Sequence, residues 1–338
     1  MRSIEELDER LSRPRPELVA DLRRLDGDVV VLGASGKLGV SLVRLAVRGI
    51  EAAGTGARVV AVSRYGAPGA REAMEATGAE VVAADVADDD ALAALPDAAN
   101  VVYLVGAKFG TEGHQAGTWE TNVYLPGRVA RRYAGSRISA LSTGNVYPLV
   151  DVGGGGATED TPPGPIGEYA MSCLGRERVL QAASQRDGTP VAIIRLNYAV
   201  EMRYGVLVDL AQAIAAGEPV DVTMGSLNLV WQGYANEVTL RALLHASTPP
   251  LLLNVTGPET LGVRRLAGDL SAALDKPVTF TGAEAPTALL ANAQRCHGLF
   301  GYPDVTVPEL VEATAHWVRA GLPTLGKPTK FQRRDGKF

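Results

Sequence analysis

The sequence predicts an α/β fold in which a doubly wound parallel sheet is followed by a smaller C-terminal α/β part. Three observations predict it. Short apolar runs rich in valine and isoleucine alternate with stretches of helical periodicity between residues 28 and 196. These runs are continuously apolar, as in strands that helices cover on both faces. A glycine-rich turn follows the first run directly and leads into a helical stretch.

The composition is that of a soluble globular chain without a strong charge bias. Its 338 residues are 46% hydrophobic and carry a formal net charge of −5, which argues against a nucleic-acid-binding protein. The charged start lacks the apolar run of a signal peptide, and no stretch approaches the roughly 20 apolar residues of a membrane helix. Two cysteines make neither a disulfide framework nor a cysteine-rich zinc site, so we expect no metal and a cytoplasmic location.

The elements follow one another in a regular order. Residues 1–26 are predicted to be an amphipathic helical extension, broken around Pro14 and Pro16. Strands are predicted at 28–32, 57–63, 80–84, 100–105, 137–142 and 190–196, and helices at 37–48, 70–77, 91–95, 116–134 and 169–184. This alternation predicts right-handed βαβ units within a domain that spans residues 27–198.

The remaining segments depart from this alternation. Four prolines and four consecutive glycines lie within residues 148–167, which are predicted to be a long mobile loop. Beyond residue 198 the pattern loosens. Residues 199–320 are therefore predicted to be a smaller substrate-binding part, interleaved with the first domain, and residues 321–338 to be a polar, basic tail.

The glycine-rich turn is the most informative segment, because its spacing is that of a phosphate-binding loop. In Gly33-Ala-Ser-Gly36-Lys-Leu-Gly39, the first glycine permits the tight turn, the second lets the backbone approach a pyrophosphate, and the third lets the helix pack on the sheet. The alternative is a glycine-rich turn that binds nothing. The strand–turn–helix context favours a Rossmann dinucleotide site. Its candidate cofactor-binding residues are Gly33, Ser35, Gly36, Lys37, Leu38 and Gly39.

The end of the second strand indicates which dinucleotide is preferred. It reads Ser63-Arg64, where NAD-binding proteins place an acidic residue for the ribose hydroxyl. An arginine there suits the 2′-phosphate of NADP, and Lys37 is expected to add charge nearby, so NADP is predicted in preference to NAD. In the alternative, Arg64 covers the adenine or points to solvent. Asp85 and Val86, after the third strand, are expected beside the adenine.

Further motifs resemble the extended short-chain dehydrogenase/reductase family, in its NAD-dependent epimerase/dehydratase group. The likeness covers about residues 27–320. Its motifs are Val105-Gly106-Ala107 after the fourth strand, Asn122-Val, Leu141-Ser-Thr143-Gly-Asn-Val-Tyr147, Glu168-Tyr169, Ile194-Arg-Leu-Asn197, Asn254-Val-Thr-Gly-Pro258 and Leu299-Phe-Gly-Tyr-Pro303. The resemblance implies that Val105, Gly106, Ala107 and Asn122 lie on the cofactor side.

The resemblance also implies a catalytic pair and, at a third position, a residue that departs from the family. In the family a tyrosine moves a proton at the substrate oxygen, a serine or threonine hydrogen-bonds the same oxygen, and a lysine four residues after the tyrosine lowers its pKa. Here these positions hold Tyr169, Thr143 and Cys173. Free tyrosine has a pKa of about 10, so a cation is needed to make its phenolate accessible at neutral pH.

Two other residues are candidates to supply that cation. Lys108 follows the loop that the family places beside the nicotinamide, and Arg176 lies on the same helical face as Cys173. The alternative is that Lys108 and Arg176 are both ordinary surface charges. Cys173 is a possible nucleophile, although a buried, inert cysteine is the simpler interpretation.

The resemblance gives a class of substrate. Asn145, Asn197, Arg203 and Trp231 are predicted to contact it, with residues 148–167 as a lid. We expect an NAD(P)-dependent oxidoreductase or epimerase acting on a sugar or other hydroxylated small molecule. The alternatives are a non-redox lyase or isomerase and a catalytically silent dinucleotide sensor. The family often pairs two long helices between subunits, here 116–134 and 169–184, so a homodimer is also expected.

Overall fold

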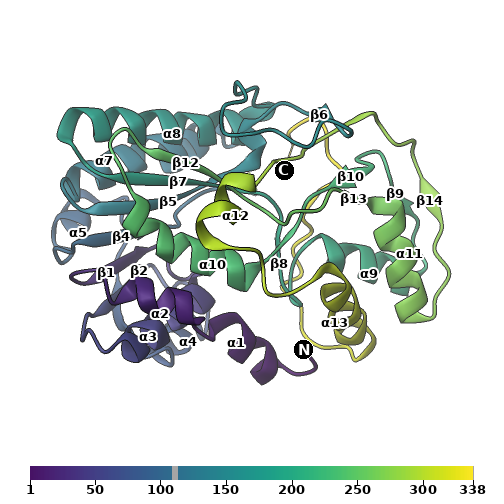
Figure 1. Ribbon diagram of the computed structural model, residues 1–338, viewed down its shortest axis with the longest axis horizontal. Coiled ribbons are helices and arrows are strands. Elements are labelled where there is room, and N and C mark those ends of the chain that lie inside the picture. The colour runs from purple at the N-terminus through teal and green to yellow at the C-terminus, as the bar shows by residue number, and fades with distance from the viewer. Residues whose placement is uncertain (109–112, 338) are drawn as a thin grey trace.

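The computed structural model describes residues 1–108 and 113–337, so four residues of the predicted Rossmann domain and Phe338 of the predicted tail lie outside it. A parallel sheet with the order β12-β7-β5-β4-β1-β2-β3 forms its centre (Figure 1). Its strands are β1 Val29–Leu32, β2 Val59–Ser63, β3 Glu80–Ala83, β4 Asn100–Tyr103, β5 Arg137–Thr143, β7 Val191–Leu196 and β12 Leu251–Val255. This topology confirms the predicted fold class. The strand Leu251–Val255 was not predicted, and it pairs with β7.

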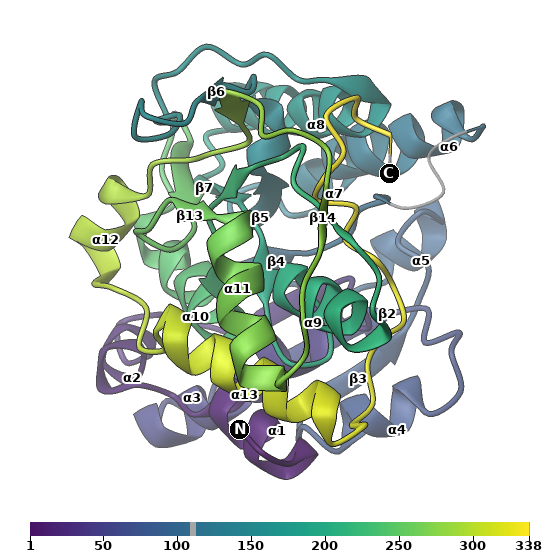
Figure 2. The same cartoon turned by 90° about the vertical axis from the view of Figure 1, so that its right-hand side faces the viewer.

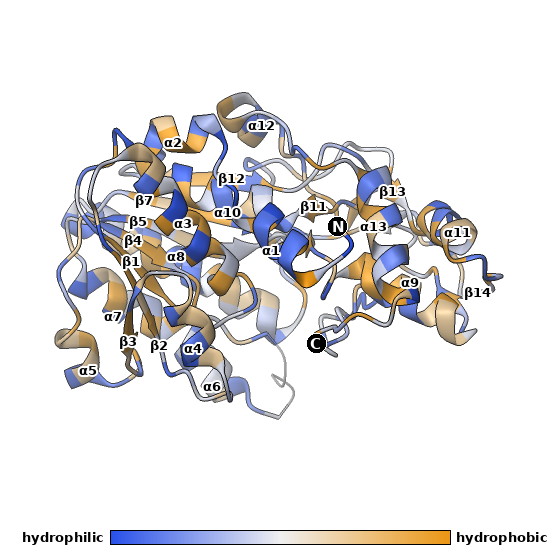
Figure 3. Cartoon of the chain, turned by 90° about the horizontal axis from the view of Figure 1, so that it is seen from below, coloured by the Kyte–Doolittle hydropathy of each residue, from blue (hydrophilic) through white to orange (hydrophobic). Residues whose placement is uncertain are grey.

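Helices cover both faces of the sheet, because alternate side chains of each strand point to opposite faces and nearly all are apolar. Side chains of α2, α3 and α10 share one core with Val29 and Val31, whereas those of α5, α7 and α8 share another with Val30 and Leu32. Figure 3 shows apolar residues concentrated in the strands and hydrophilic ones on the surrounding helices. The helices of this domain are α2 Pro16–Leu22, α3 Gly39–Ala53, α4 Ala70–Glu75, α5 Asp89–Ala93, α6 Gln115–Trp119, α7 Leu125–Arg132, α8 Gly167–Asp187 and α10 Gln232–Arg241, with the short turns η2 Gly144–Val146 and η3 Ala242–His245.

The helix predicted over 116–134 is interrupted by a π-helical segment, η1, at Glu120–Tyr124. The cause lies in Pro126, which has no N–H to donate to the carbonyl of Asn122 four residues earlier. The Arg176 side chain donates to that carbonyl instead, at 3.3 Å. The interruption therefore ties the middle of this helix to α8.

The second part consists of three helices and four short strand pairs (Figure 2). Helices α9 Val206–Ala216, α11 Val263–Leu274 and α13 Val307–Arg319 pack on one another around a common apolar core. The strand pairs are β8 Ala199–Val200 with β11 Val230–Trp231, β9 Val220–Asp221 with β14 Phe280–Thr281, β10 Ser226–Leu227 with β13 Leu261–Gly262, and β6 Val150–Asp151 with β15 Thr287–Ala288. The short helix α12 Gln294–Phe300 packs beside β12.

The segment 148–167 was expected to be a mobile loop, and the structure corrects this. Its β6 strand pairs with β15, and Ala157 exchanges backbone hydrogen bonds with Leu290 and Asn292 at 2.9 and 2.8 Å. The Asn254 side chain also donates to the Ala157 carbonyl. These partners lie more than 90 residues away in the sequence, so local composition gave no sign of them.

Both terminal segments are fixed to the body of the protein. The first 26 residues hold α1 Ile4–Ser12 and α2, and α2's flanking Arg15 pairs with Glu237 on α10 at 2.7 Å. The tail has no regular structure, yet Phe331 is only 6% exposed and Thr329 only 3%. In Figure 2 the tail runs from α13 along the side of the molecule and ends near α8.

Candidate functional site

The loop Gly33–Gly39 has the geometry of a phosphate cradle at the carboxyl edge of the sheet. Gly33 adopts a φ of +83°, and a Cβ there would lie 2.9 Å from the backbone nitrogen of Val105. A Cβ on Gly39 would overlap the carbonyl of Ala34, so only glycine lets α3 begin this close to the strand. The half-buried Lys37 and Leu38 and the exposed Ser35 and Gly36 complete the loop. This cradle fits a dinucleotide pyrophosphate, because the glycine turn leads directly into the N-terminus of α3, and a helix N-terminus favours a phosphate.

The adenosine side of the cradle is open. The hydroxyls of Ser35 and Ser63 lie 2.5 Å apart. Arg64 is 77% exposed and lies 3.8 Å from a carboxylate oxygen of Asp85, which also accepts the backbone N–H of Ala87. Val86, by contrast, is buried in the sheet core, where it supports this edge from below.

Lys37 does not lie at the adenosine side, where it was expected to help bind a 2′-phosphate. Its ammonium points toward the second part, where it donates to the carbonyl of Ala199 at 2.6 Å and lies 3.9 Å from the centre of the Tyr204 ring. Burial lowers the pKa of Lys37 to about 7, with Glu201 raising it and Lys108 lowering it further. Lys37 therefore lines the same cavity as Thr143.

The loop after β4 is held by one side chain from the π-helical segment. The Asn122 amide accepts the N–H of Ala107 and donates to its carbonyl, both at 2.9 Å. Arg176 donates to the Asn122 side chain at 2.7 Å and to the Leu141 carbonyl at 2.8 Å. A Cβ on Gly106 would lie 2.8 Å from that guanidinium. Arg176 therefore holds Val105–Ala107 in place.

Thr143 and Tyr169 come together as the sequence predicted. Thr143 ends β5, and its hydroxyl accepts from the amide of Asn145 at 2.9 Å. Tyr169 lies in the first turn of α8. Burial raises the pKa of Tyr169 well above its usual value, while the charge of Arg176 and a hydrogen bond with Thr143 act in the opposite direction.

Lys108 and Cys173 flank this pair. The Lys108 ammonium lies 5.9 Å from the centre of the Tyr169 ring, and burial lowers its pKa to about 8. Cys173 is only 1% exposed, and burial raises the pKa of its thiol. A thiol in this environment stays protonated, which counts against Cys173 as a nucleophile.

One cavity of about 300 Å³ brings nearly half of the predicted residues together. Those that line it are Gly36, Lys37, Leu38, Gly106, Ala107, Lys108, Thr143, Asn145, Tyr169, Arg176 and Asn197. Arg203 lies instead beside a neighbouring cavity at the outer side of the phosphate loop, where it pairs with Asp8 and Glu201. Trp231 was expected to contact substrate, but it is 1% exposed and packs in the core of the second part.

A buried polar network behind Thr143 was not predicted. Glu177 on α8 pairs with Arg195 on β7 at 2.7 Å and accepts from the hydroxyl of Ser142 at 2.6 Å. Arg195 also donates to the Tyr147 hydroxyl, which donates to Asn254. An arginine inside the apolar run of β7 was a signal that could have revealed it, because buried charges are paired.

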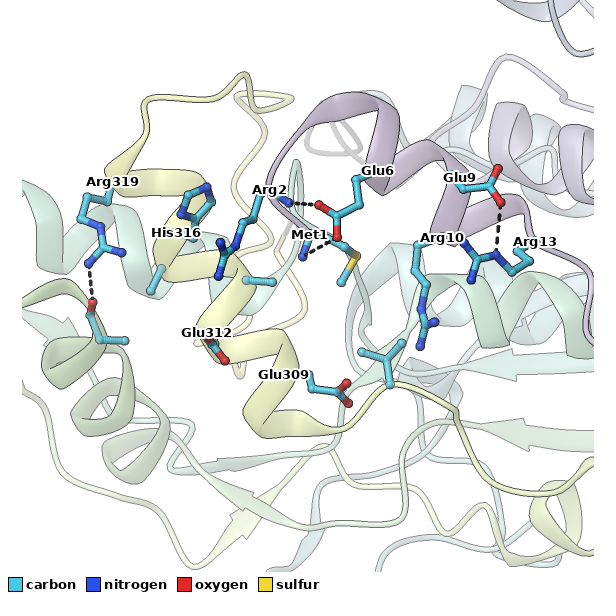
Figure 4. A pocket seen from close by; sticks show the side chains of 14 residues that line it. Met1, Arg2, Glu6, Glu9, Arg10, Arg13, Glu309, Glu312, His316 and Arg319 are labelled. Atoms are coloured by element: carbon cyan, nitrogen blue, oxygen red, sulfur yellow. Dashed lines mark hydrogen bonds and ion pairs between the residues drawn. The ribbon is translucent and has the colours of Figure 1, made fainter.

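Another cavity, of about 670 Å³, lies elsewhere, between α1 and α13 (Figure 4). It carries charges of both signs: Arg2, Glu6, Glu9, Arg10, Arg13, Glu309, Glu312 and Arg319. Such a balanced lining selects no charged ligand. Among the described residues, no group of histidine, cysteine and carboxylate side chains could hold a metal ion, and no helix is long and apolar enough to cross a membrane.

Comparisons with known proteins agree with this arrangement. Residues 29–228 match the model of the NAD dependent epimerase/dehydratase family. No curated protein sequence matches the chain.

Solved structures match it over 87% of its length. One is UDP-glucuronic acid 4-epimerase from Bacillus cereus in complex with NAD, with a TM-score of 0.72, 16% identity and 99% of that chain covered. Another is dTDP-glucose 4,6-dehydratase from Streptomyces venezuelae with NAD and TYD bound, with a TM-score of 0.72, 19% identity and 97% covered. A third is the UDP-glucose 4-epimerase of Thermus thermophilus in complex with NAD, with a TM-score of 0.71, 20% identity and 100% covered. At these identities the likeness concerns the fold.

Proposed function

Because the chain belongs to the NAD-dependent epimerase/dehydratase family, we propose that it is an enzyme that binds a nicotinamide dinucleotide and acts on a carbinol or carbonyl group of a hydroxylated small molecule. One observation carries the proposal: Thr143 and Tyr169 line the same cavity as Gly36 of the phosphate cradle. A substrate oxygen between the two hydroxyls would therefore lie next to the cofactor.

The cradle described above supports the cofactor assignment. The backbone of residues 33–39 would hold the pyrophosphate, and the segment 105–107 would lie along the nicotinamide ribose. A bound nicotinamide dinucleotide would supply hydride-transfer chemistry beside the substrate carbon.

The residues of the chain supply the proton chemistry. Tyr169 would take the proton of the substrate hydroxyl or return it, while Thr143 hydrogen-bonds the same oxygen. We propose that Lys108 supplies the cation that the family places at Cys173. Arg176 is the alternative for this role, because its positive charge lowers the pKa of Tyr169, although its guanidinium is bound to Leu141 and Asn122. It acts as a positioning residue for the loop beside the cofactor.

Replacing Lys108 with methionine is expected to lower kcat by about 100-fold, within the range of general acid–base effects. Without the ammonium the pKa of Tyr169 rises, so the limb of the kcat profile that needs its phenolate should move to higher pH. The measurement is kcat against pH, with NADH affinity determined by calorimetry. Lys276→Met, at an exposed position, is the matched control. An unchanged pH profile would show that the cation comes from another residue.

The choice of cofactor depends on Arg64. The family is NAD-dependent, so we propose NAD(H) as a cofactor, and we keep NADP preference as a hypothesis because the exposed Arg64 lies at the end of β2. If Arg64 binds a 2′-phosphate, Arg64→Ala should weaken NADPH binding about tenfold, the effect of one charge-assisted contact, and leave NADH binding unchanged. Calorimetry with both cofactors checks this. Equal losses for both would show that Arg64 contacts the adenosine instead.

The kind of reaction is settled by following the cofactor during turnover. A net change in nicotinamide absorbance indicates an oxidoreductase. Deuterium exchange with labelled cofactor, without a net absorbance change, indicates an epimerase. Turnover that survives cofactor removal would instead indicate the non-redox alternative, and cofactor binding without turnover would indicate a sensor.

The homodimer stays a prediction. Trp119, Tyr124 and Met171 are exposed apolar side chains on α6, on η1 and on α8, the helices expected to pair between subunits.

A further inference from the structure

The charges that line the catalytic cavity are of one sign. Three cationic side chains line it, those of Lys37, Lys108 and Arg176, and no carboxylate does among the described residues. Two nearby acidic groups raise the pKa of Lys37 and are themselves engaged: Glu201 pairs with Arg203, and Asp209 accepts two hydrogen bonds from Thr329. Positive charges that converge on a low-dielectric cavity favour an anionic ligand.

Lys37 is placed to be the anion-binding group. Its stem starts in the phosphate loop, and its ammonium crosses to the Ala199 carbonyl, away from the adenosine side. Burial lowers the pKa of Lys37 to about 7, so a bound anion would favour its protonated form. The ammonium has three donors, and the bond to this carbonyl leaves others for a ligand. Because Lys37 and Thr143 line the same cavity, a molecule that contacts both carries its anionic group and its hydroxyl a short distance apart.

The C-terminal tail borders this cavity. Thr329 lines it, and is held there by its backbone N–H and hydroxyl, which both donate to Asp209, at 2.8 and 2.5 Å. The buried Phe331 anchors the tail in the core, and Arg334 donates to the carbonyl and hydroxyl of Thr287. Further on, Gly336 packs against the backbone at Gly167, two residues before Tyr169.

The cavity is small for its task. Its volume of about 300 Å³ is at the lower end of ligand sites, and the nicotinamide end of the cofactor must share it. The space that remains suits a compact molecule. A substrate with a nucleotide diphosphate attached would have to extend out of it, into the neighbouring cavity of about 620 Å³ that the tail residues Leu325 and Lys327 also line.

We propose that, given the function proposed above, the substrate is a compact hydroxy carboxylic acid whose carboxylate binds Lys37 while its hydroxyl lies between Thr143 and Tyr169. In this assignment the tail, through Thr329, is the wall that sets the length of the substrate. The assignment makes Lys37 and Thr329 specificity-determining residues of the site.

The test is calorimetric titration of the NADH-loaded protein with gluconate, with sorbitol as the neutral analogue of equal chain length, and with UDP-glucose. We expect gluconate to bind at least tenfold more tightly than sorbitol, and Lys37→Met to abolish that preference. Lys276→Met, at an exposed position, should keep it. Equal affinity for gluconate and sorbitol overturns the proposal. It is also overturned if Lys37→Met weakens NADH binding but leaves the gluconate preference intact, because Lys37 then serves the cofactor phosphates.

The role of the tail is tested with two variants, because removing the tail also removes the buried Phe331 and exposes part of the core. One lacks residues 327–338, and the other, Asp209→Ala, releases Thr329 but keeps the tail. Both should bind gluconate more weakly and UDP-glucose at least tenfold more tightly than the parent protein. If the parent protein binds UDP-glucose more tightly than gluconate, this inference is wrong while the proposed function stands. If NADH itself does not bind, the proposed function fails instead.

Discussion

Replacing Tyr169 with phenylalanine is expected to lower kcat by about 10²–10⁴-fold, the usual contribution of a positioned acid or base. The phenyl ring keeps the packing of the cavity wall but has no hydroxyl to take the substrate proton. Affinity for NADH should stay the same, because the phosphate cradle and the loop 105–107 are untouched. Kinetics at saturating substrate, combined with calorimetry for NADH, measure both quantities.

The matched control is Tyr302→Phe, which removes a hydroxyl from a side chain that is 65% exposed and outside the cavity. It should behave like the parent protein. If Tyr169→Phe also retains full turnover, the proton is moved by another group, and the non-redox alternative gains support. The companion variant Thr143→Ala separates the two roles, because it removes a hydrogen bond to the same oxygen without removing the acid.

Replacing Arg195 with methionine is expected to lower the free energy of unfolding by about 3–5 kcal/mol, as for other buried ion pairs that lose one partner. Arg195 and Glu177 have side chains that are 2% and 0% exposed, so Glu177 would be left as an uncompensated buried charge. The loss reflects the desolvation of that carboxylate more than the value of the pair itself. Urea denaturation monitored by circular dichroism measures it.

Two further variants locate the cause. Arg265→Met breaks an exposed pair with Asp269 and should change stability little, because solvent screens such pairs. The double variant Arg195→Met with Glu177→Leu should recover much of the lost stability, since both charges are then absent. A double variant as unstable as Arg195→Met would show that the network matters through its bonds to Ser142 and Tyr147 rather than through buried charge.

The sheet and the cradle were predictable from sequence because their signals are local. Each strand is a short apolar run, and the glycines of 33–39 recur at the spacing of a phosphate loop, although the contact that requires Gly33 is with Val105 after the neighbouring strand. Thr143 and Tyr169 were found through a resemblance whose motifs sit at fixed places in that sheet. Their meeting follows from the topology, which places the end of β5 beside the start of α8.

What the sequence could not predict depends on partners far along the chain. The pairing of β6 with β15 turns an expected mobile loop into a fixed one, across more than 130 residues. Trp231 was predicted to contact the substrate because it is an aromatic residue next to polar ones, but the packing of the second part buries it. The direction of Lys37 is set by a carbonyl at Ala199, which no periodicity reveals.

The N-terminal extension has a mechanical consequence for how ligands enter. Asp8 on α1 lies 3.4 Å from Arg44 on α3 and 3.0 Å from Arg203 in the second part, so one carboxylate links the two halves of the molecule. A hinge motion that separated the halves would break at least one of these ion pairs. The tail is held separately, since Thr329 donates to Asp209 and accepts from the backbone N–H of Phe331. Exchange of small molecules is therefore expected to require either the loss of an Asp8 ion pair or a local opening of the tail.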